Sequence, residues 1–285
     1  VSARHAAAKF GFARAATDVE PLLADADVDA VVIATRHASH ARLVLAALVA
    51  HKHVFVEKPL CTSLDDLERL ERAFAAAPEQ LVMVGYNRRF APHVIELRQL
   101  LGSSPEPKVM LMTVNAGAVP RDHWVVDPEV GGGRVVGEAC HFIDLLRHLA
   151  GAPIVQHAVH TRRTGGAERG NDDVTLTLTF GDGSLGTIVY TSSGHRSFPK
   201  ERLEVFQAGR VLRLDNFRSL SGWGVTRLPR RPTLRLPRMA QDKGQVAGVR
   251  AFIEAIARGG PAPIPLDELI EVARVSILAQ RAVSG

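Results

Sequence analysis

The sequence predicts an α/β protein in which a Rossmann-like parallel-sheet domain is followed by an α+β domain with a mostly antiparallel open sheet. Residues 1–105 alternate helical and strand patterns, which is typical of parallel strands joined by right-handed crossovers. A stretch rich in Gly, Ser and Pro follows at 102–107, and beyond it strand patterns succeed one another with few helices between them. Because neighbouring strands of this kind favour antiparallel pairing, we place the two domains at 1–105 and 106–285.

The first half opens with a helical pattern in which Ala3, Ala7 and Phe10 share a face and Gly11 suits the C-cap position. Ser63 suits the N-cap of a later helix, because its hydroxyl can accept a backbone N–H. The elements expected here are helices at 3–10, 19–26, 40–50, 64–77 and 92–101, and strands at 30–34, 54–56 and 81–85.

Two short turns mark hairpins in the second half. Residues 180–184 (Phe-Gly-Asp-Gly-Ser) separate two alternating apolar and polar segments, and residues 207–210 hold another turn containing glycine. The elements expected here are strands at 109–114, 154–160, 174–180, 184–192, 202–207 and 211–215, and helices at 133–150, 245–258 and 266–283.

Composition limits the class of protein. The chain has 285 residues, of which 46% are hydrophobic and 23% charged, as in an ordinary globular protein. No apolar run approaches the roughly 20 residues that span a bilayer, and no signal-peptide pattern is present. Cys61 and Cys140 allow at most one disulfide and show no metal-ligand spacing. We therefore expect a cytoplasmic protein with free thiols and no bound metal.

The net charge of +5 has two explanations. It reflects either a generally arginine-rich composition or attraction to ligands that carry phosphate. Nucleic-acid binding would need a basic stripe within a known motif, and the sequence shows none. The expected partner is a small molecule, with neither nucleic acid nor membrane.

One segment places a lysine where ligands bind. A strand pattern, a helical pattern and a second strand pattern end in Glu57-Lys58-Pro59. Ligands of open α/β sheets bind at the carboxyl ends of the strands, and the following proline narrows the backbone conformations open to Lys58. Lys58 could there act as a base or as a hydrogen-bond donor. The alternative is a surface lysine paired with Glu57.

Four motifs resemble those of the glucose–fructose oxidoreductase / inositol dehydrogenase / MocA-like (Gfo/Idh/MocA) family, and the resemblance covers nearly the whole chain. Glu-Lys-Pro alone would be a weak signal, but four motifs in the same order and spacing are specific. The motifs are Ala34-Thr35 … His40 with residues 51–59 (HKHVFVEKP), residues 85–90 (GYNRRF), Gly131-Gly132-Gly133 … His141 … Asp144, and residues 241–244 (QDKG).

The resemblance implies an enzyme that uses NAD or NADP to transfer a hydride to or from a carbinol or carbonyl carbon of a sugar, cyclitol or related polyol. It also implies homo-oligomerisation through an exposed sheet face. The catalytic residues expected from it are Lys58, His141 and Glu138. The expected cofactor contacts are Ala34, Thr35, His40, Glu57, Lys58, Pro59 and Asn87, and the expected substrate contacts are Arg88, Arg121, His123, Trp124 and Asp144.

The expected helix at 133–150 would place Gly137, His141 and Asp144 on one polar face. A helical histidine is alternatively a packed or solvated residue. Much of the family has aspartate where this chain has Gly137. The neighbouring Glu138 could supply that carboxylate, although it is turned by about 100° around the helix.

A dinucleotide-binding domain opens with a strand, a glycine-rich turn and a helix, and the chain contains no G-x-G-x-x-G. We expect that this first strand and turn are missing through N-terminal truncation, so the sequence does not distinguish NAD from NADP. The rival hypothesis is a non-catalytic ligand-binding or regulatory protein on the same fold.

Overall fold

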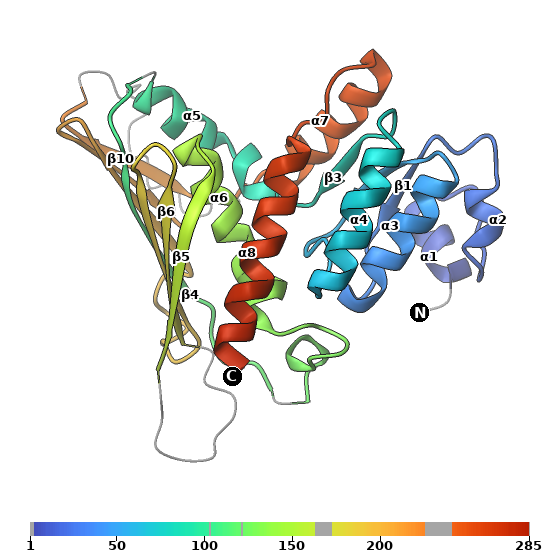
Figure 1. Ribbon diagram of the computed structural model, residues 1–285, viewed down its shortest axis with the longest axis horizontal. Coiled ribbons are helices and arrows are strands. Elements are labelled where there is room, and N and C mark those ends of the chain that lie inside the picture. Colours follow the sequence, from blue (N-terminus) through green and yellow to red (C-terminus); the bar gives the residue numbers. More distant parts are fainter. Residues whose placement is uncertain (1–2, 103, 121, 163–172, 226–240, 285) are drawn as a thin grey trace.

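Two separate sheets organise the chain. The computed structural model describes residues 3–102, 104–120, 122–162, 173–225 and 241–284. Within them a three-stranded sheet has the order β1-β2-β3, and a seven-stranded sheet has the order β10-β9-β8-β4-β7-β6-β5. The two sheets lie at opposite ends of Figure 1, with the long helix α8 between them. This arrangement confirms the predicted fold class.

The first sheet is parallel throughout, as its alternating sequence pattern predicted. Helix α3 packs on strands β1 and β2 and against α4. The strands are β1 (Ala30–Ile33), β2 (His53–Val56) and β3 (Val82–Val84), and the helices are α1 (Ala3–Phe10), α2 (Glu20–Leu23), α3 (His40–Val49), α4 (Leu64–Ala76) and α5 (Pro92–Leu101).

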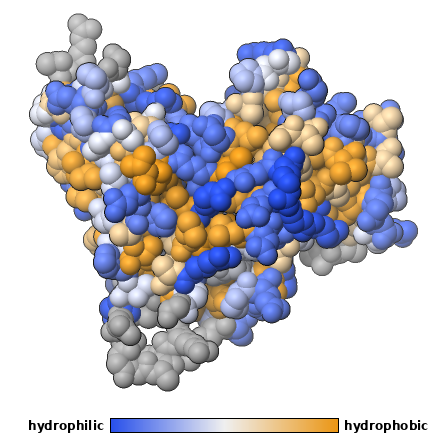
Figure 2. Space-filling model, viewed as in Figure 1, coloured by the Kyte–Doolittle hydropathy of each residue, from blue (hydrophilic) through white to orange (hydrophobic). Residues whose placement is uncertain are grey.

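Helix α4 shows how the sequence fixes one of these elements. The Ser63 hydroxyl accepts a hydrogen bond from the backbone N–H of Asp66 at 3.1 Å, so the predicted N-cap is confirmed. Leu67, Leu70 and Phe74 recur at helical spacing and are buried. Charged side chains cover the opposite face, where Figure 2 shows hydrophilic surface. The amphipathic pattern therefore decides which side of α4 faces the protein.

The second sheet is mostly antiparallel: β4 runs parallel to β7, and the other pairs are antiparallel. Strand β10 was not predicted, because its sequence, Ser-Leu-Ser-Gly-Trp, contains a glycine and little alternation; it is held by pairing with β9. The strands are β4 (Val109–Asn115), β5 (Ile154–Thr161), β6 (Val174–Phe180), β7 (Leu185–Thr191), β8 (Glu201–Gln207), β9 (Arg210–Asp215) and β10 (Ser219–Trp223).

Helices cover one face of this sheet, on the side towards the first half of the chain (Figure 1). The covering helices include α6 (Cys140–Ala150), which contacts β7, and α8 (Leu266–Ser284), which contacts β5. Helix α8 also contacts α4 and β3, and α7 (Gln245–Arg258) contacts β2. The C-terminal helices thus pack on both halves, and the division at residue 105 stays a prediction. No helix in the described part of the chain is long and apolar enough to cross a membrane.

The segment expected as one helix at 133–150 begins as a π-helical turn, Val135–Ala139, and continues as α6. The side-chain oxygen of Gln280 accepts the backbone N–H of Val135 at 2.9 Å, which satisfies one of the free donors at this helix start. Every residue of α6 except His148 is buried. Helix α6 is therefore enclosed on all sides, and its polar residues His141 and Asp144 are buried along with its apolar ones.

Candidate functional site

The carboxyl ends of β1, β2 and β3 meet at one edge of the first sheet. Ile33 pairs with Val56 and Val56 with Val84, so the residues that follow these three strand ends come together. Ala34 and Thr35 are exposed there. A Cβ on Gly85 would lie 3.1 Å from the Glu57 carboxylate. Glycine at this position thus leaves room for the glutamate at the edge.

Lys58 joins this edge to the second half of the chain. Its Nζ donates a hydrogen bond to the backbone carbonyl of Gly137 at 2.6 Å, in the π-helical turn before α6. The peptide bond between Lys58 and Pro59 is cis. Among the described residues no ion pair joins Lys58 to Glu57, so the alternative of a surface pair between them does not describe this structure.

His141 lies in α6, directly after the same turn in the chain, and its imidazole is buried and neutral. It is 7% exposed, and its Nδ1 is buried without a hydrogen-bond partner in the described structure. Burial lowers its pKa well below the usual value, and the positive charges of Arg88 and Lys58 act in the same direction. Its ring lies edge-on to Tyr86, whose hydroxyl is also buried and unpartnered. Such unsatisfied buried polar atoms are rare in native proteins, so we treat His141 as a candidate site residue.

His37, which the motif pattern passed over, also belongs to this cluster. Its Nδ1 lies 2.7 Å from the carbonyl oxygen of Gly131, and the side chain is 5% exposed. A Cβ on residue 137 would come within 2.9 Å of His37 Cε1, so the ring occupies the space that a side chain would need there. The only sequence signal was its position between Thr35 and His40, the two residues that the family resemblance selected.

The carboxylate of Glu138 has hydrogen-bond partners other than Lys58 and His141. Its carboxylate accepts hydrogen bonds from the Tyr190 hydroxyl at 2.5 Å and from Lys200 Nζ at 2.7 Å, and it pairs with Arg134. These interactions attach the π-helical turn to the second sheet, and none of them involves Lys58 or His141. Burial alone would raise the pKa of Glu138, but the Lys200 and Tyr190 hydrogen bonds and the two cations outweigh it and lower the pKa to about 2.

This lowered pKa predicts an acid-sensitive contribution to stability. In the unfolded chain Glu138 titrates near 4.5, so its native contacts stabilise the fold fully above pH 4.5 and are lost as the pH falls towards 2. Glu138→Gln is expected to reduce the free energy of unfolding by on the order of 2 kcal/mol at pH 7, and by much less at pH 3. Urea titration at both pH values measures the difference. The exposed Glu106→Gln is the control, and an equal loss for Glu138→Gln at both pH values would contradict the assignment.

Two expected substrate contacts are instead buried ion pairs. Both Nε and a terminal nitrogen of Arg88 donate to the Glu201 carboxylate, at 2.8 and 2.9 Å, and Arg88 is 6% exposed. Asp144 is fully buried and accepts two hydrogen bonds from Arg89, at 2.5 and 3.1 Å. Both side chains are thus bonded to partners inside the protein. The expectation that Arg88 and Asp144 contact substrate stays a prediction, and in this structure both side chains are engaged in ion pairs.

The remaining expected contact residues differ in where they lie and in what they bond. His40 is fully buried and connects the Pro59 and Thr35 carbonyls, at 2.7 and 3.1 Å. Asn87 donates to the Lys243 carbonyl at 2.7 Å. Trp124 packs edge-on to His37 with ring centroids 4.8 Å apart, and its neighbour His123 is exposed. Arg121 lies outside the residues that the structure describes.

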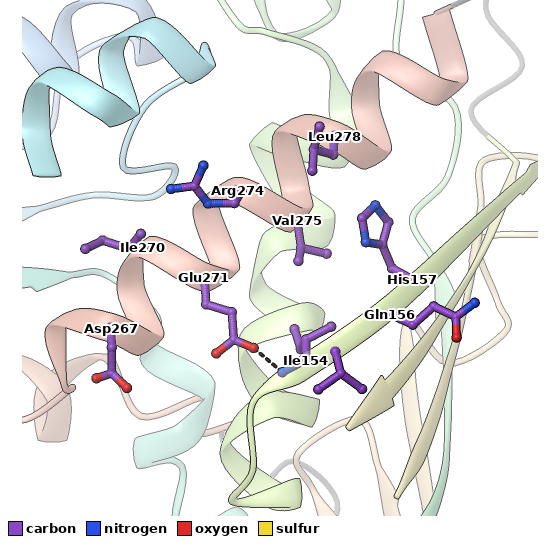
Figure 3. Close-up of a pocket in the computed structure, with 10 residues that line it drawn as sticks. Ile154, Gln156, His157, Asp267, Ile270, Glu271, Arg274, Val275 and Leu278 are labelled. Carbon is purple, nitrogen blue, oxygen red and sulfur yellow. Dashed lines mark hydrogen bonds between the residues drawn. The ribbon is translucent and has the colours of Figure 1, made fainter. Parts of the chain in front are cut away.

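A cavity of about 410 Å³ opens elsewhere, between α8 and β5 (Figure 3). Glu271 bridges these elements, because its carboxylate accepts the backbone N–H of Ile154 and pairs with Arg147 at 2.8 Å. Ile270, Val275 and Leu278 supply apolar lining. None of the expected site residues lines this cavity, so we locate the candidate site at the strand ends around Lys58.

Comparison with known proteins accounts for these motifs. Residues 1–86 match the family model described as an oxidoreductase family with an NAD-binding Rossmann fold, and residues 106–208 match the model of the GFO/IDH/MocA C-terminal domain. The two models together match more than half of the chain. The chain belongs to the Gfo/Idh/MocA family. The predicted resemblance is thereby confirmed.

Curated relatives of this Gfo/Idh/MocA chain include inositol dehydrogenases. A myo-inositol 2-dehydrogenase of Thermotoga maritima is 29% identical over 216 residues, which are 74% of this chain and 63% of the relative. An inositol 2-dehydrogenase of Saccharopolyspora erythraea is 34% identical over 164 residues, which are 58% of this chain and 47% of the relative. The chain therefore spans less than two thirds of the length of these relatives.

Solved structures share the fold. An oxidoreductase domain protein from Kribbella flavida has a TM-score of 0.83 at 23% identity, covering 99% of this chain and 85% of its own. A levoglucosan dehydrogenase in complex with NADH and levoglucosan has a TM-score of 0.83 at 20% identity, with the same coverage. At these identities the likeness establishes the architecture of this Gfo/Idh/MocA chain.

Proposed function

We propose that the protein is an NAD(P)-dependent oxidoreductase that transfers a hydride between the nicotinamide and a carbinol or carbonyl carbon of a sugar, cyclitol or related polyol. The observation that carries the proposal is the Lys58 amine held at the Gly137 carbonyl, together with the buried His141, whose Nδ1 has no partner in the described structure and whose pKa the charge of Lys58 helps to lower. The names of the inositol and levoglucosan dehydrogenases among the similar proteins support this substrate class.

The residues at the strand ends fit a nicotinamide ring. Ala34 and Thr35 are exposed there, and His141, whose Nδ1 is unpartnered in the described structure, packs edge-on to Tyr86, which follows β3. Ala34, Thr35, Glu57, Pro59 and Asn87 would hold this half of the cofactor, and His40 would support them through its two carbonyl contacts. When bound, the nicotinamide supplies the site that accepts or returns the hydride.

The protein must then handle the proton of the substrate hydroxyl. We assign its removal to the Lys58 amine, which lies at the strand end and is oriented by the Gly137 carbonyl. His141 is a weak base because its pKa is lowered, so its part is to accept a hydrogen bond and orient the reacting hydroxyl. Glu138 is bonded to Tyr190 and Lys200 and takes no part in the transfer in this proposal.

The test is cofactor binding followed by turnover. NADH and NADPH are titrated separately into the complete gene product and followed by calorimetry, and polyols are then screened for reduction of NAD⁺ or NADP⁺, starting with myo-inositol. Micromolar binding of one cofactor and turnover of a polyol support the proposal. A folded protein that binds neither cofactor refutes it and favours the non-catalytic ligand-binding alternative.

We also propose that the protein assembles as a homo-oligomer through the open face of the second sheet. Adjacent strands expose five apolar side chains there: Val109, Leu111, Leu185, Val189 and Phe206. Apolar surface gathered in this way is typical of an interface. Leu111→Arg would place a charge within it and is expected to convert the assembly to monomers in light scattering after size exclusion. An unchanged mass would exclude this face, and Ile95→Arg on exposed helix α5 is the control.

We also propose that the protein is located in the cytoplasm. Cys61 and Cys140 are both free and buried, which is the usual state of cysteines in a reducing compartment.

A further inference from the structure

We propose that His37 contacts the ligand directly, with its Nε2 accepting a hydrogen bond from a non-reacting hydroxyl of the bound polyol. This assignment rests on the proposed function, since it gives His37 a place in the same site. It makes His37 a residue that determines which polyol is accepted. Three features of its surroundings support the assignment.

The first feature is its position. Because Gly137 has no side chain, the imidazole of His37 lies against the π-helical turn. A Cβ added at residue 137 would be 2.9 Å from Cε1 of His37 and 3.4 Å from its Nδ1. Lys58 Nζ donates to the carbonyl of the same glycine at 2.6 Å. The ring of His37 and the amine of Lys58 therefore reach the same residue, and the ring is a neighbour of the group to which we assign proton removal.

The second feature is its tautomer. The Gly131 carbonyl can only accept, so the Nδ1 of His37, 2.7 Å away, carries the proton. Burial lowers the pKa of His37 to about 4, and the charge of Lys58 acts in the same direction, so the ring is neutral at physiological pH. Nε2 then presents a lone pair, and in the described structure no residue donates to it.

The third feature is rigidity. Trp124 packs edge-on against the ring, and the backbone N–H of the adjacent Ala38 donates to the Val130 carbonyl at 3.1 Å. The acceptor is thus fixed before any ligand arrives, which lowers the entropic cost of binding. A fixed acceptor beside the lysine that binds the reacting oxygen suits a vicinal hydroxyl, which polyols and cyclitols carry and simple alcohols lack.

Steady-state kinetics with myo-inositol, or with the polyol that the screen above ranks first, test the assignment. His37→Ala is expected to raise KM about tenfold, the effect of one hydrogen bond, with a smaller change in kcat. His37→Gln retains an acceptor and is expected to recover part of the loss. Gly137→Ala displaces the ring, so it should also raise KM. In the double variant the effects should not add, because both changes remove the same contact.

Nitrogen-15 spectra of the histidine rings give a readout independent of turnover. We expect His37 to be the neutral Nδ1–H tautomer at pH 7, and its Nε2 resonance to shift when myo-inositol is added to the complex with NADH. Packing alone would leave that resonance unmoved.

The two proposals fail differently. If the unaltered protein neither turns over nor binds any polyol, the proposed function is refuted and the assignment of His37 falls with it. If the unaltered protein turns over a polyol, but His37→Ala leaves KM unchanged and Nε2 does not respond, the assignment of His37 is overturned and the function stands.

Discussion

Lys58→Ala is expected to lower kcat for polyol oxidation about a thousandfold and to weaken NADH binding far less, through loss of its expected cofactor contact. A positioned acid or base contributes roughly 10²–10⁴ in rate, and Lys58 is held at the strand end by its 2.6 Å bond to the Gly137 carbonyl. Kinetics report the first effect, and fluorescence titration with NADH reports the second. Thermal melts show whether the lost hydrogen bond also destabilises the fold.

Lys58→Arg separates two roles of the lysine. Arginine keeps the positive charge but does not give up its proton in proteins. If Lys58 removes the proton, the arginine variant should be about as inactive as the alanine variant; if Lys58 only supplies charge, arginine should restore much of the rate. Lys9→Ala, on the exposed helix α1, is the matched control and should behave as the unaltered protein. A Lys58→Ala variant that keeps more than a tenth of the rate would refute the assignment.

The sequence predicted those features whose signals are local. Helix α4 carries its cap, its acidic first turn and its buried stripe within residues 63–76, and most strands of the second sheet show clear alternation. The position of Lys58 at a strand end followed in the same way from a strand pattern and a proline. Strand β10 was missed because its formation depends on β9 as a neighbour rather than on its own residues.

The parts of the site that sequence could not predict depend on distant partners. Arg88 meets Glu201, which is 113 positions away in the chain, and His37 meets the carbonyl of Gly131, 94 positions away. No local pattern distinguishes an arginine that will be buried with a glutamate from one that faces a substrate. The direction of the Glu138 side chain was also not predictable. The expectation assumed a regular α-helix, but Glu138 lies in the π-helical turn.

The largest loss of stability is expected from Asp144→Ala. The change leaves the Arg89 guanidinium, whose side chain is 3% exposed, with Glu268 as its remaining carboxylate partner. Removing one member of a buried pair costs about 3–5 kcal/mol, and we expect a value near the lower end because Glu268 still pairs with the buried Arg89. We expect the melting temperature to fall by roughly 10 °C. Urea titration at pH 8 is suitable, because burial raises the pKa of Asp144 to about 6 and the carboxylate is ionised there.

Two further variants decide whether this loss comes from burial of the charge. Glu254→Ala breaks the exposed pair with Arg258, whose side chains are 48% and 76% exposed, and should cost less than about 1 kcal/mol. Arg89→Met combined with Asp144→Ala removes both charges and should recover part of the stability, as buried pairs replaced by apolar residues do. If Asp144→Ala costs no more than Glu254→Ala but abolishes polyol binding, Asp144 would be a substrate contact after all. A large loss that the double variant partly reverses would establish the pair as a structural link between α6 and the segment that follows β3.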